Sequence, residues 1–270
     1  MPPISLDQEY IEKLIKISKN AGDAIMDIYE SEFDVNFKSD QSPLTKADVL
    51  SNKIICQSLK KITPDIPILS EECCDIPFEE RSSWKTYWLV DPLDGTKEFI
   101  NKNGEFTVNI ALIRDNKPIF GVINIPTINK TFWGAETLGS YEINKNKDVK
   151  KISNVKKINK KIRILTSRSH IEAEMDIIKG IEDYELLPTG SSLKFCLIAN
   201  GQADAYIRLG PTSEWDVAAG HAIIEYSGCI ITDLKGKKIK YNQGESFIMK
   251  GFMVSKNKQI SNIFSSLLMN

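Results

Sequence analysis

The start of the chain carries the pattern of amphipathic helices. Apolar residues between positions 5 and 30 recur at spacings of three and four, the period of a helix with one buried face. A second stretch of this kind follows Pro43 and continues to Leu59, and Thr63-Pro64 is a typical stop signal. We therefore expect two helices here, the first buried along Ile11, Leu14, Ile15, Ile17, Ala21, Ala24, Ile25 and Ile28.

The pattern then changes to that of β-strands. β-branched and aromatic runs separated by turn residues predict strands at 66–69, 87–90, 107–113, 119–125 and 131–135. Helices and strands then alternate, with strands expected at 163–166, 205–209, 229–232 and 252–255, and helices at 191–203, 214–226 and the end of the sequence. We expect an α+β layered domain over 1–150 and an α/β domain over 151–270.

Lysine is concentrated between these two halves. Residues 145–161 hold eight lysines among asparagine and isoleucine, and no aromatic side chain that could stack on a base. A run of like charges is usually solvated. We interpret this run as a solvated loop or hairpin, and the net charge of −1 likewise gives no reason to expect a nucleic-acid partner.

Composition excludes several other classes of protein. The chain is 41% hydrophobic and 26% charged, and no apolar stretch approaches the roughly 18 residues that span a bilayer. Residues 1–9 do not resemble a signal peptide, so we expect a cytoplasmic protein. With only His170 and His221 as imidazoles, a bound metal should have oxygen ligands. The five cysteines fit no disulfide framework or zinc pattern: Cys56, Cys73, Cys74, Cys196 and Cys229.

Two aspartates follow the apolar run 88–90. Asp-Pro and Asp-Gly are common turn signals, so Asp91 and Asp94 have an ordinary structural explanation. They are also close enough in sequence to share a cation, with the Leu93 carbonyl between them. Residues 95–97 are typical of a helix start, whose backbone N–H groups receive anions.

Three further carboxylates are candidates for the same site. Glu71 and Glu72 follow the predicted strand 66–69, and Asp216 lies in the first turn of the helix 214–226. Each has a structural alternative, a solvated loop for the glutamates and helix capping for Asp216. Together they would supply the hard oxygen ligands of magnesium, with Asp91 as the natural bridging ligand. Two ions about 4 Å apart can hold the attacking and leaving oxygens of phosphoryl transfer.

Two segments together resemble a known family. Asp91-Pro-Leu-Asp-Gly-Thr and Trp215-Asp216-x-Ala-Ala-Gly are similar to the paired signatures of the inositol monophosphatase-like, lithium-sensitive phosphatases. Ser70-Glu71-Glu72 lies upstream in the expected order, and 43–48 resembles the family's Thr-x-x-Asp element. The resemblance covers essentially the whole chain. It implies a layered α/β/α/β/α sandwich of the inositol monophosphatase and fructose-1,6-bisphosphatase type.

Within the family, three segments resemble the bacterial 3′(2′),5′-bisphosphate nucleotidases of sulfate assimilation: 89–99, 104–111 and 190–196. That branch implies magnesium-dependent hydrolysis of adenosine 3′,5′-bisphosphate to AMP and phosphate without a phosphoenzyme, and inhibition by lithium. Preference between this nucleotide and its 5′-phosphosulfate analogue stays open. So do a homodimer and peripheral association with the inner membrane.

The resemblance also implies roles for single residues. Two or three Mg²⁺ ions would be bound, one by Glu71, Asp91 and the Leu93 carbonyl, another by Asp91, Asp94 and Asp216. Thr96, Asp48 and Glu72 would orient and deprotonate the attacking water. Substrate contacts would come from Glu71, Leu93, Asp94, Gly95, Thr96, His170, Ser191, Lys194, Arg208 and Asp216.

Alternatives stay open at this stage. An inositol monophosphatase or a sugar-bisphosphate phosphatase would share the carboxylates, and so would a catalytically inactive nucleotide-binding protein or a structural calcium module. Lys194 and Arg208 have a second interpretation as surface charges, His170 as a loop residue, and Ser191 as a helix N-cap. A substrate with two phosphates favours cationic anchors away from the metals.

Overall fold

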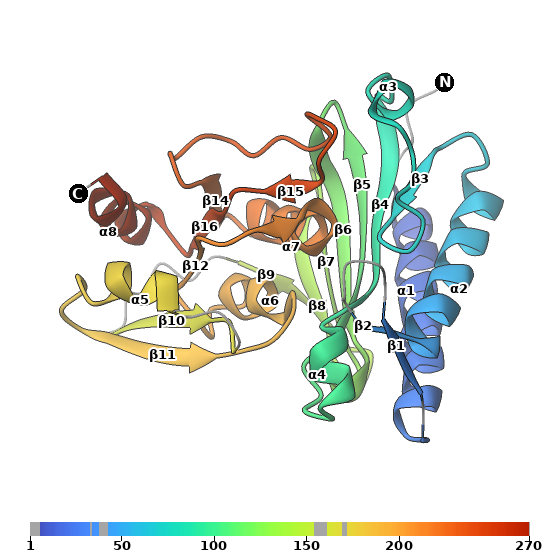
Figure 1. Cartoon of the computed structure of the whole chain (residues 1–270), viewed down its shortest axis with the longest axis horizontal. Coiled ribbons are helices and arrows are strands. Elements are labelled where there is room, and N and C mark those ends of the chain that lie inside the picture. Colours follow the sequence, from blue (N-terminus) through green and yellow to red (C-terminus); the bar gives the residue numbers. More distant parts are fainter. Residues whose placement is uncertain (1–5, 33, 38–42, 154–160, 169–171, 270) are drawn as a thin grey trace.

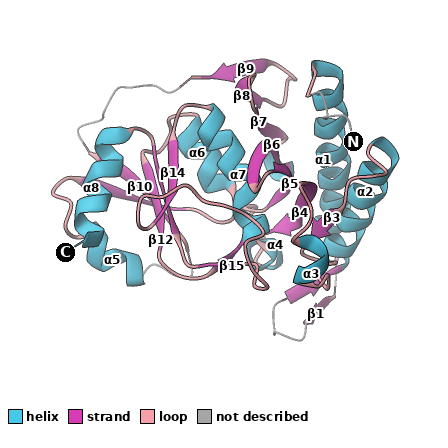
Figure 2. Ribbon diagram, turned by 90° about the horizontal axis from the view of Figure 1, so that it is seen from above, coloured by secondary structure: helices cyan, strands magenta, loops and turns pink. Residues whose placement is uncertain are grey.

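The fold is a stack of five layers, helices alternating with sheets (Figure 1). A computed structural model describes residues 6–32, 34–37, 43–153, 161–168 and 172–269. Helices α1 (Gln8–Tyr29) and α2 (Lys46–Ile62) pack on one face of the first sheet. Helices α6 (Leu193–Ala199) and α7 (Glu214–Tyr226) lie between the two sheets, and α5 (Glu172–Ile178) and α8 (Lys258–Met269) cover the second (Figure 2).

The first sheet has seven strands within the described residues, in the order β3-β4-β5-β6-β7-β8-β9. Only β3 and β4 are parallel, and the other neighbours form an antiparallel meander. The strands are β3 (Ile68–Ser70), β4 (Thr86–Asp94), β5 (Thr107–Arg114), β6 (Lys117–Ile125), β7 (Lys130–Ala135), β8 (Gly139–Ile143) and β9 (Val149–Ile152).

The second sheet has the order β11-β10-β12-β16-β14 in the part of the chain that the structure describes. Its strands are β10 (Ile162–Thr166), β11 (Tyr184–Pro188), β12 (Ala205–Arg208), β14 (Ile230–Asp233) and β16 (Phe252–Ser255). Two small ribbons pair β1 (Val35–Phe37) with β2 (Pro43–Thr45) and β13 (Thr212–Ser213) with β15 (Ile248–Met249). Short helices occur at α3 (Phe78–Arg81), α4 (Thr96–Ile100) and η1 (Pro126–Ile128).

Close packing of α7 on the first sheet depends on small residues. A Cβ placed on Gly121 of β6 would lie 2.4 Å from the Ala219 carbonyl oxygen, and one on Gly134 of β7 would lie 2.8 Å from that of Ala222. Real Cβ atoms do not approach so closely, so glycine is required at both positions. The small residues after Asp216, among them Ala219 and Ala222, permit this close approach.

Most predicted elements are confirmed, with instructive differences. The predicted strand 87–90 is longer, because β4 continues to Asp94 instead of turning after Val90. The predicted helix 191–203 is shorter, and α6 covers only Leu193–Ala199. Within the lysine-rich run, β9 pairs with β8 as a hairpin, which agrees with the expectation for its first part, and residues 154–160 lie outside the described chain.

The passage from one sheet to the other falls between β9 and β10. The division into domains 1–150 and 151–270 stays a prediction, since one core cluster contains buried residues of both, such as Leu89 and Phe195. Among the described residues, no helix combines the length and the apolar character needed to cross a membrane.

Candidate active site

Three carboxylates from distant parts of the described chain converge on one point. Glu71, Asp91 and Asp216 each offer an oxygen, and these oxygens all lie within 4.8 Å of one another. Glu71 follows β3, whose parallel pairing with β4 sets Ser70 beside Val90, and the Glu71 N–H donates to the Val90 carbonyl at 3.1 Å. Asp216 arrives from the other half of the chain, in the first turn of α7.

A register irregularity in β4 shapes the segment between Asp91 and Asp94. The Leu93 N–H donates to Asp91 Oδ1 at 3.0 Å, so the side chain of the first aspartate fastens the backbone of the bulge. The Ser51 hydroxyl of α2 donates to the Pro92 carbonyl at 2.7 Å. The aspartates therefore lie in an irregular strand that continues past Val90, and the turn that Asp-Pro signals does not form directly after Val90.

Asp216 is held by its own helix. Its Oδ2 accepts a hydrogen bond from the Ser213 N–H at 3.0 Å, as part of the capping box of α7 with Ser213 as N-cap. The Thr212 hydroxyl donates to the same oxygen at 2.8 Å. The capping interpretation of this residue is confirmed, and the same side chain belongs to the acidic cluster. Capping orients the carboxylate and does not compete with its place in the cluster.

The electrostatics of the cluster match a cation site. Burial first, and then the charges of Glu71, Asp94 and Asp216, raise the pKa of Asp91 well above its ordinary value. Burial, followed by Asp94 and Glu71, raises the pKa of Asp216 to about 7. Carboxylates packed together away from water repel one another unless a positive charge is present. The oxygen-only donor set fits a hard divalent cation such as Mg²⁺.

Thr96 and Asp48 form a pair beside the bulge. The Thr96 hydroxyl donates to Asp48 Oδ1 at 3.1 Å, and the Leu93 carbonyl oxygen lies 3.3 Å from the same hydroxyl. Asp48 Oδ2 accepts from the N–H and the hydroxyl of Thr45, at 2.7 and 2.6 Å, in the capping box of α2. Burial raises the pKa of Asp48 despite these hydrogen bonds. Gly95 precedes α4, at the predicted helix start, and its left-handed φ of 91° favours glycine at this position.

Asp94 connects the bulge to the second half of the molecule. Its Oδ2 accepts from the N–H and the hydroxyl of Ser192, both at 2.6 Å, and from Asn109 Nδ2 at 3.3 Å. The Ser192 hydroxyl also lies 2.7 Å from the Asp216 carbonyl oxygen. Asp94 is outside the group of three convergent oxygens, although its charge acts on both Asp91 and Asp216.

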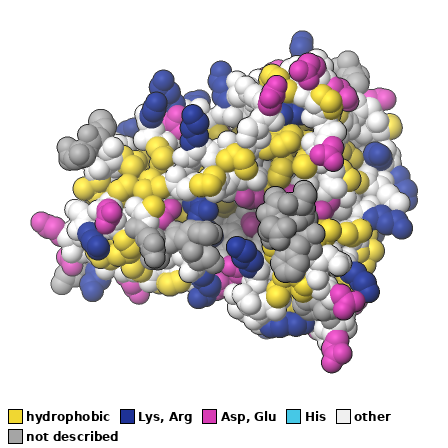
Figure 3. Space-filling view, in the orientation of Figure 1, with side chains coloured by type: hydrophobic (Ala, Val, Ile, Leu, Met, Phe, Trp, Pro, Cys, Tyr) yellow, Lys and Arg dark blue, Asp and Glu magenta, His cyan; other side chains and the backbone are white. Residues whose placement is uncertain are grey.

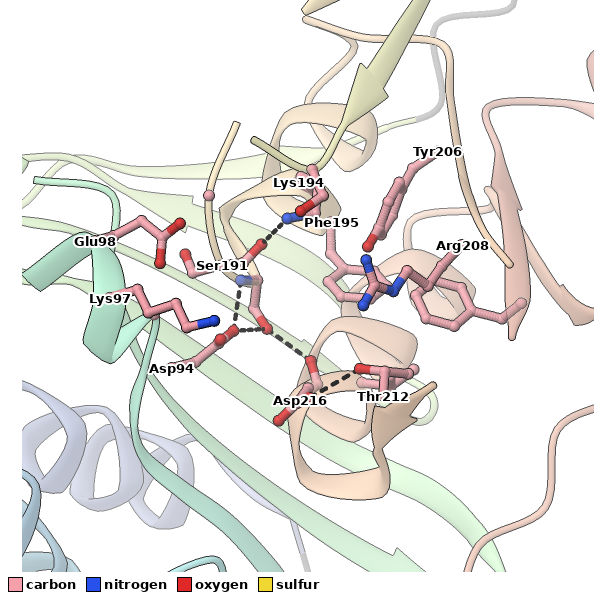
Figure 4. A pocket seen from close by; sticks show the side chains of 16 residues that line it. Asp94, Lys97, Glu98, Ser191, Lys194, Phe195, Tyr206, Arg208, Thr212 and Asp216 are labelled. Atoms are coloured by element: carbon pink, nitrogen blue, oxygen red, sulfur yellow. Dashed lines mark hydrogen bonds between the residues drawn. The ribbon is translucent and has the colours of Figure 1, made fainter. Parts of the chain in front are cut away.

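A pocket opens next to the cluster, in the recess between the two halves where Figure 3 shows acidic and basic side chains together. Asp94 and Asp216 lie on one side and Lys194 and Arg208 on the other (Figure 4). The lining is completed by Gly95, Lys97, Glu98, Ser167, Gly190, Ser191, Ser192, Phe195, Tyr206, Thr212, Val217 and Phe252.

Lys194 is a buried cation. Its side chain donates to the carbonyls of Thr189 at 3.1 Å and Ser191 at 2.8 Å, and the residue is 6% exposed. Burial lowers its pKa to about 8, against the opposing effect of Asp94 and other acids nearby. The interpretation of Lys194 as a surface charge is therefore wrong. Arg208 lines the pocket and donates to the Pro211 carbonyl at 3.1 Å.

The other predicted residues are placed less tightly. Ser191 lines the pocket, and its hydroxyl accepts from the Leu193 N–H at 3.3 Å, which is a helix-start contact. Glu72 is half-buried in the turn after β3 and is not one of the three clustered carboxylates. His170 lies outside the described residues.

Three contacts at the site were not predicted from the sequence. Ser192 and Asn109 hold Asp94, and Thr212 holds Asp216. The sequence pattern of a capping box points to Ser213 as the N-cap ahead of Asp216, but it does not point to Thr212 one residue earlier. Ser192 and Asn109 lie in segments that resemble the nucleotidases, but the resemblance did not indicate their contact with Asp94, because each meets that partner only through the fold.

The five-layer fold and the acidic cluster between its sheets define a class of layered α/β protein with a carboxylate site suited to a divalent cation. The chain belongs to the inositol monophosphatase family, whose model matches residues 6–263. It is 45% identical over 249 residues to a 3′(2′),5′-bisphosphate nucleotidase CysQ of Escherichia coli K12, covering 91% of this chain and 99% of that protein.

Solved structures agree with this family. The crystal structure of CysQ from Bacteroides thetaiotaomicron matches with a TM-score of 0.80 and 34% identity, covering 94% of this chain and 99% of that one. An inositol monophosphatase from Anabaena matches with a TM-score of 0.77 at 22% identity, covering 97% and 96%, a likeness that concerns the fold alone. The predicted fold and family are confirmed.

Proposed function

We propose that this protein is a magnesium-dependent 3′(2′),5′-bisphosphate nucleotidase that hydrolyses adenosine 3′,5′-bisphosphate to AMP and phosphate. One observation carries the proposal: a single pocket has carboxylates on one side, Asp94 and Asp216, and cations on the other, Lys194 and Arg208. A substrate with two phosphates needs both. The similarity to CysQ nucleotidases, at 45% identity, supports the same reaction.

The carboxylates would hold the metal. Glu71, Asp91 and Asp216 are the convergent ligands, and Asp94 and the Leu93 carbonyl would complete a set for two or three Mg²⁺ ions. When bound, these ions neutralise charge on the phosphate and make water a better nucleophile. The donor chemistry supports this assignment, because all the groups are oxygens, and because burial and neighbouring acids raise the pKa values of Asp91 and Asp216, an effect that a bound cation would oppose.

The Thr96–Asp48 pair would move the proton. Because the Thr96 hydroxyl donates its own hydrogen to Asp48, its lone pairs point elsewhere and can accept a hydrogen bond from the attacking water. Asp48 then takes the proton through this hydroxyl, a role that its raised pKa favours. Backbone N–H groups at Gly95 and Thr96 would hold the departing phosphate, and Glu72 would assist in orienting the water.

The far side of the pocket would bind the rest of the nucleotide. Lys194 and Arg208 would anchor the second phosphate, with Ser191 as a further contact. The family resemblance adds His170 to this group. The rings of Tyr206 and Phe252 line the same wall and offer apolar faces for the nucleoside.

The test is phosphate release from adenosine 3′,5′-bisphosphate and from inositol 1-phosphate, each with magnesium and with EDTA. We expect release only with magnesium, and much faster from the nucleotide. Preference for inositol phosphate would keep the chemistry but contradict the anchoring role of Lys194 and Arg208. Nucleotide binding without release would indicate an inactive binding protein.

A further inference from the structure

Glu105 joins the two halves of the molecule at the back of the pocket. Glu105 lies just before β5. Its carboxylate accepts two hydrogen bonds from the guanidinium of Arg168, which follows β10. Arg168 Nε donates to Glu105 Oε2 at 2.7 Å and Nη2 to Oε1 at 2.5 Å. The Gly190 N–H donates to Oε2 at 2.6 Å. All three donors therefore come from the other half of the chain.

The backbone and Cβ of Glu105 lie close to two glycines of the pocket lining. A Cβ on Gly95, in the phosphate-side wall, would lie 3.0 Å from the Glu105 carbonyl oxygen. A Cβ on Gly190 would lie 3.0 Å from Glu105 Cβ and 2.7 Å from Glu98 Cγ. The two glycines let the walls approach Glu105 closely. Both also line the pocket itself.

The segment that Glu105 holds carries the contacts of the nucleotide wall. Two residues after Gly190, Ser192 binds Asp94 through its N–H and hydroxyl. The carbonyls of Thr189 and Ser191 orient the Lys194 ammonium (Figure 4). A shift of the Gly190 backbone would therefore displace the cationic anchor relative to the carboxylates.

The Glu105–Arg168 pair differs from an ordinary surface ion pair. The Glu105 side chain is 21% exposed and its partner 44%, whereas Lys117 and Glu136 meet through one contact with 54% and 39% of their side chains exposed. Partial burial acts to raise the pKa of Glu105, but the hydrogen bonds from Arg168 and Gly190 outweigh it and lower that pKa. The carboxylate is thus held ionised in a fixed orientation.

We propose that Glu105 is a positioning residue for substrate selection: it sets the wall formed by residues 189–194 against the phosphate site. Binding of a nucleotide that reaches across the pocket depends on it, and cleavage of a small phosphate monoester does not. This inference rests on the proposed nucleotidase function.

The test compares Glu105→Gln with the wild-type chain in kcat and KM for adenosine 3′,5′-bisphosphate and for p-nitrophenyl phosphate, both with magnesium. We expect kcat/KM for the nucleotide to fall about 10- to 100-fold, mainly through KM, because a misplaced anchor weakens binding. For p-nitrophenyl phosphate we expect a change of less than about twofold. The matched control is Glu136→Gln, which removes an exposed ion pair away from the pocket and should leave kcat/KM unchanged for both substrates.

Arg168→Gln and the double variant separate positioning from direct contact. If Glu105 and Arg168 act as one clamp, the double variant loses no more nucleotide kcat/KM than either single one. Additive losses would mean that Arg168 acts independently, and would overturn the clamp. Equal losses for both substrates, or a lower melting temperature with unchanged KM, would also overturn the inference. A wild-type chain that neither binds nor cleaves the nucleotide would overturn the proposed function, and the inference with it.

Discussion

Asp48 and Asp216 each occupy the third position of a helix and accept hydrogen bonds from the residue that caps it. In both, Oδ2 takes the capping contacts. The other oxygen of Asp48 faces the Thr96 hydroxyl. A carboxylate anchored to backbone N–H groups loses little further entropy when it engages a ligand, so helix capping prepares these side chains for chemistry.

Asp91→Asn tests the acidic cluster at the residue scale. Removing one of several mutually repelling carboxylates should leave the melting temperature in EDTA at pH 8 equal to or above that of the wild type, since burial and neighbouring acids raise the pKa of Asp91. Turnover should fall by more than about 100-fold, the upper range for losses of supporting groups around a metal. The measurements are thermal unfolding with EDTA and with magnesium, and phosphate release. Wild-type turnover in the variant would contradict the metal assignment.

At the scale of elements, β4 is central to the site. It carries Asp91 and Asp94, pairs in parallel with β3 to bring Glu71 alongside, and is irregular where α2 contacts it through Ser51. In the second sheet, a buried ion-pair cluster forms around Asp204, just before β12. This carboxylate accepts from Arg163 of β10 at 2.9 Å and from Lys256, after β16, at 3.3 Å.

Asp204→Asn should have the opposite effect to Asp91→Asn. The side chains of Asp204 and Lys256 are each 3% exposed, so the substitution removes a buried negative charge beside the Lys256 ammonium and should lower the free energy of unfolding by about 3 kcal/mol. Hydrogen bonds from Arg163 hold the pKa of Asp204 below its ordinary value against the effect of burial, so this stability is lost in the wild type as acid protonates the carboxylate. Urea unfolding measures the change, and an unchanged midpoint would contradict it. Phosphate release should be unaffected.

At the scale of the whole molecule, the site exists only where the two halves meet. Glu71, Asp91 and Thr96 come from the first sheet and its connections, and Asp216 and Lys194 from the helices between the sheets. Buried apolar residues of both halves form one core cluster around α6 and α7. The relative position of the carboxylates is therefore as rigid as that core.

Magnesium and pH should act on the stability of the whole molecule in a linked way. Because the folded pKa of Asp216, about 7, exceeds its ordinary value of 3.8, the folded metal-free protein binds more protons than the unfolded chain between these values. Its stability should therefore fall as pH rises from 6 to 8. Magnesium binds the ionised form, so it should raise the melting temperature more at pH 8 than at pH 6. A magnesium concentration of 100 times Kd should stabilise the folded state by about 2.7 kcal/mol. Thermal unfolding with EDTA and with magnesium at both pH values measures this, and an equal magnesium effect at both would contradict it.

The amino-acid sequence alone determined the elements whose signals are local. The apolar spacing of residues 5–30 produced α1, and the segment from Glu214 to Tyr226 formed α7 with the predicted bounds, because helix period and capping depend on neighbours along the chain. The paired signatures around Asp91 and Asp216 identified the family for a similar reason, since each is a short contiguous motif.

Only the tertiary structure decided what depends on contacts between distant residues. The length of β4 follows from pairing with β5 through Asp94, which overrides the turn preference of Asp-Pro. The burial of Lys194, the hold of Ser192 on Asp94, and the Glu105–Arg168 contact join residues far apart in sequence. The sequence does not show whether a charged side chain is exposed or buried, because its burial and its hydrogen-bond partners depend on how the two sheets pack around α6 and α7.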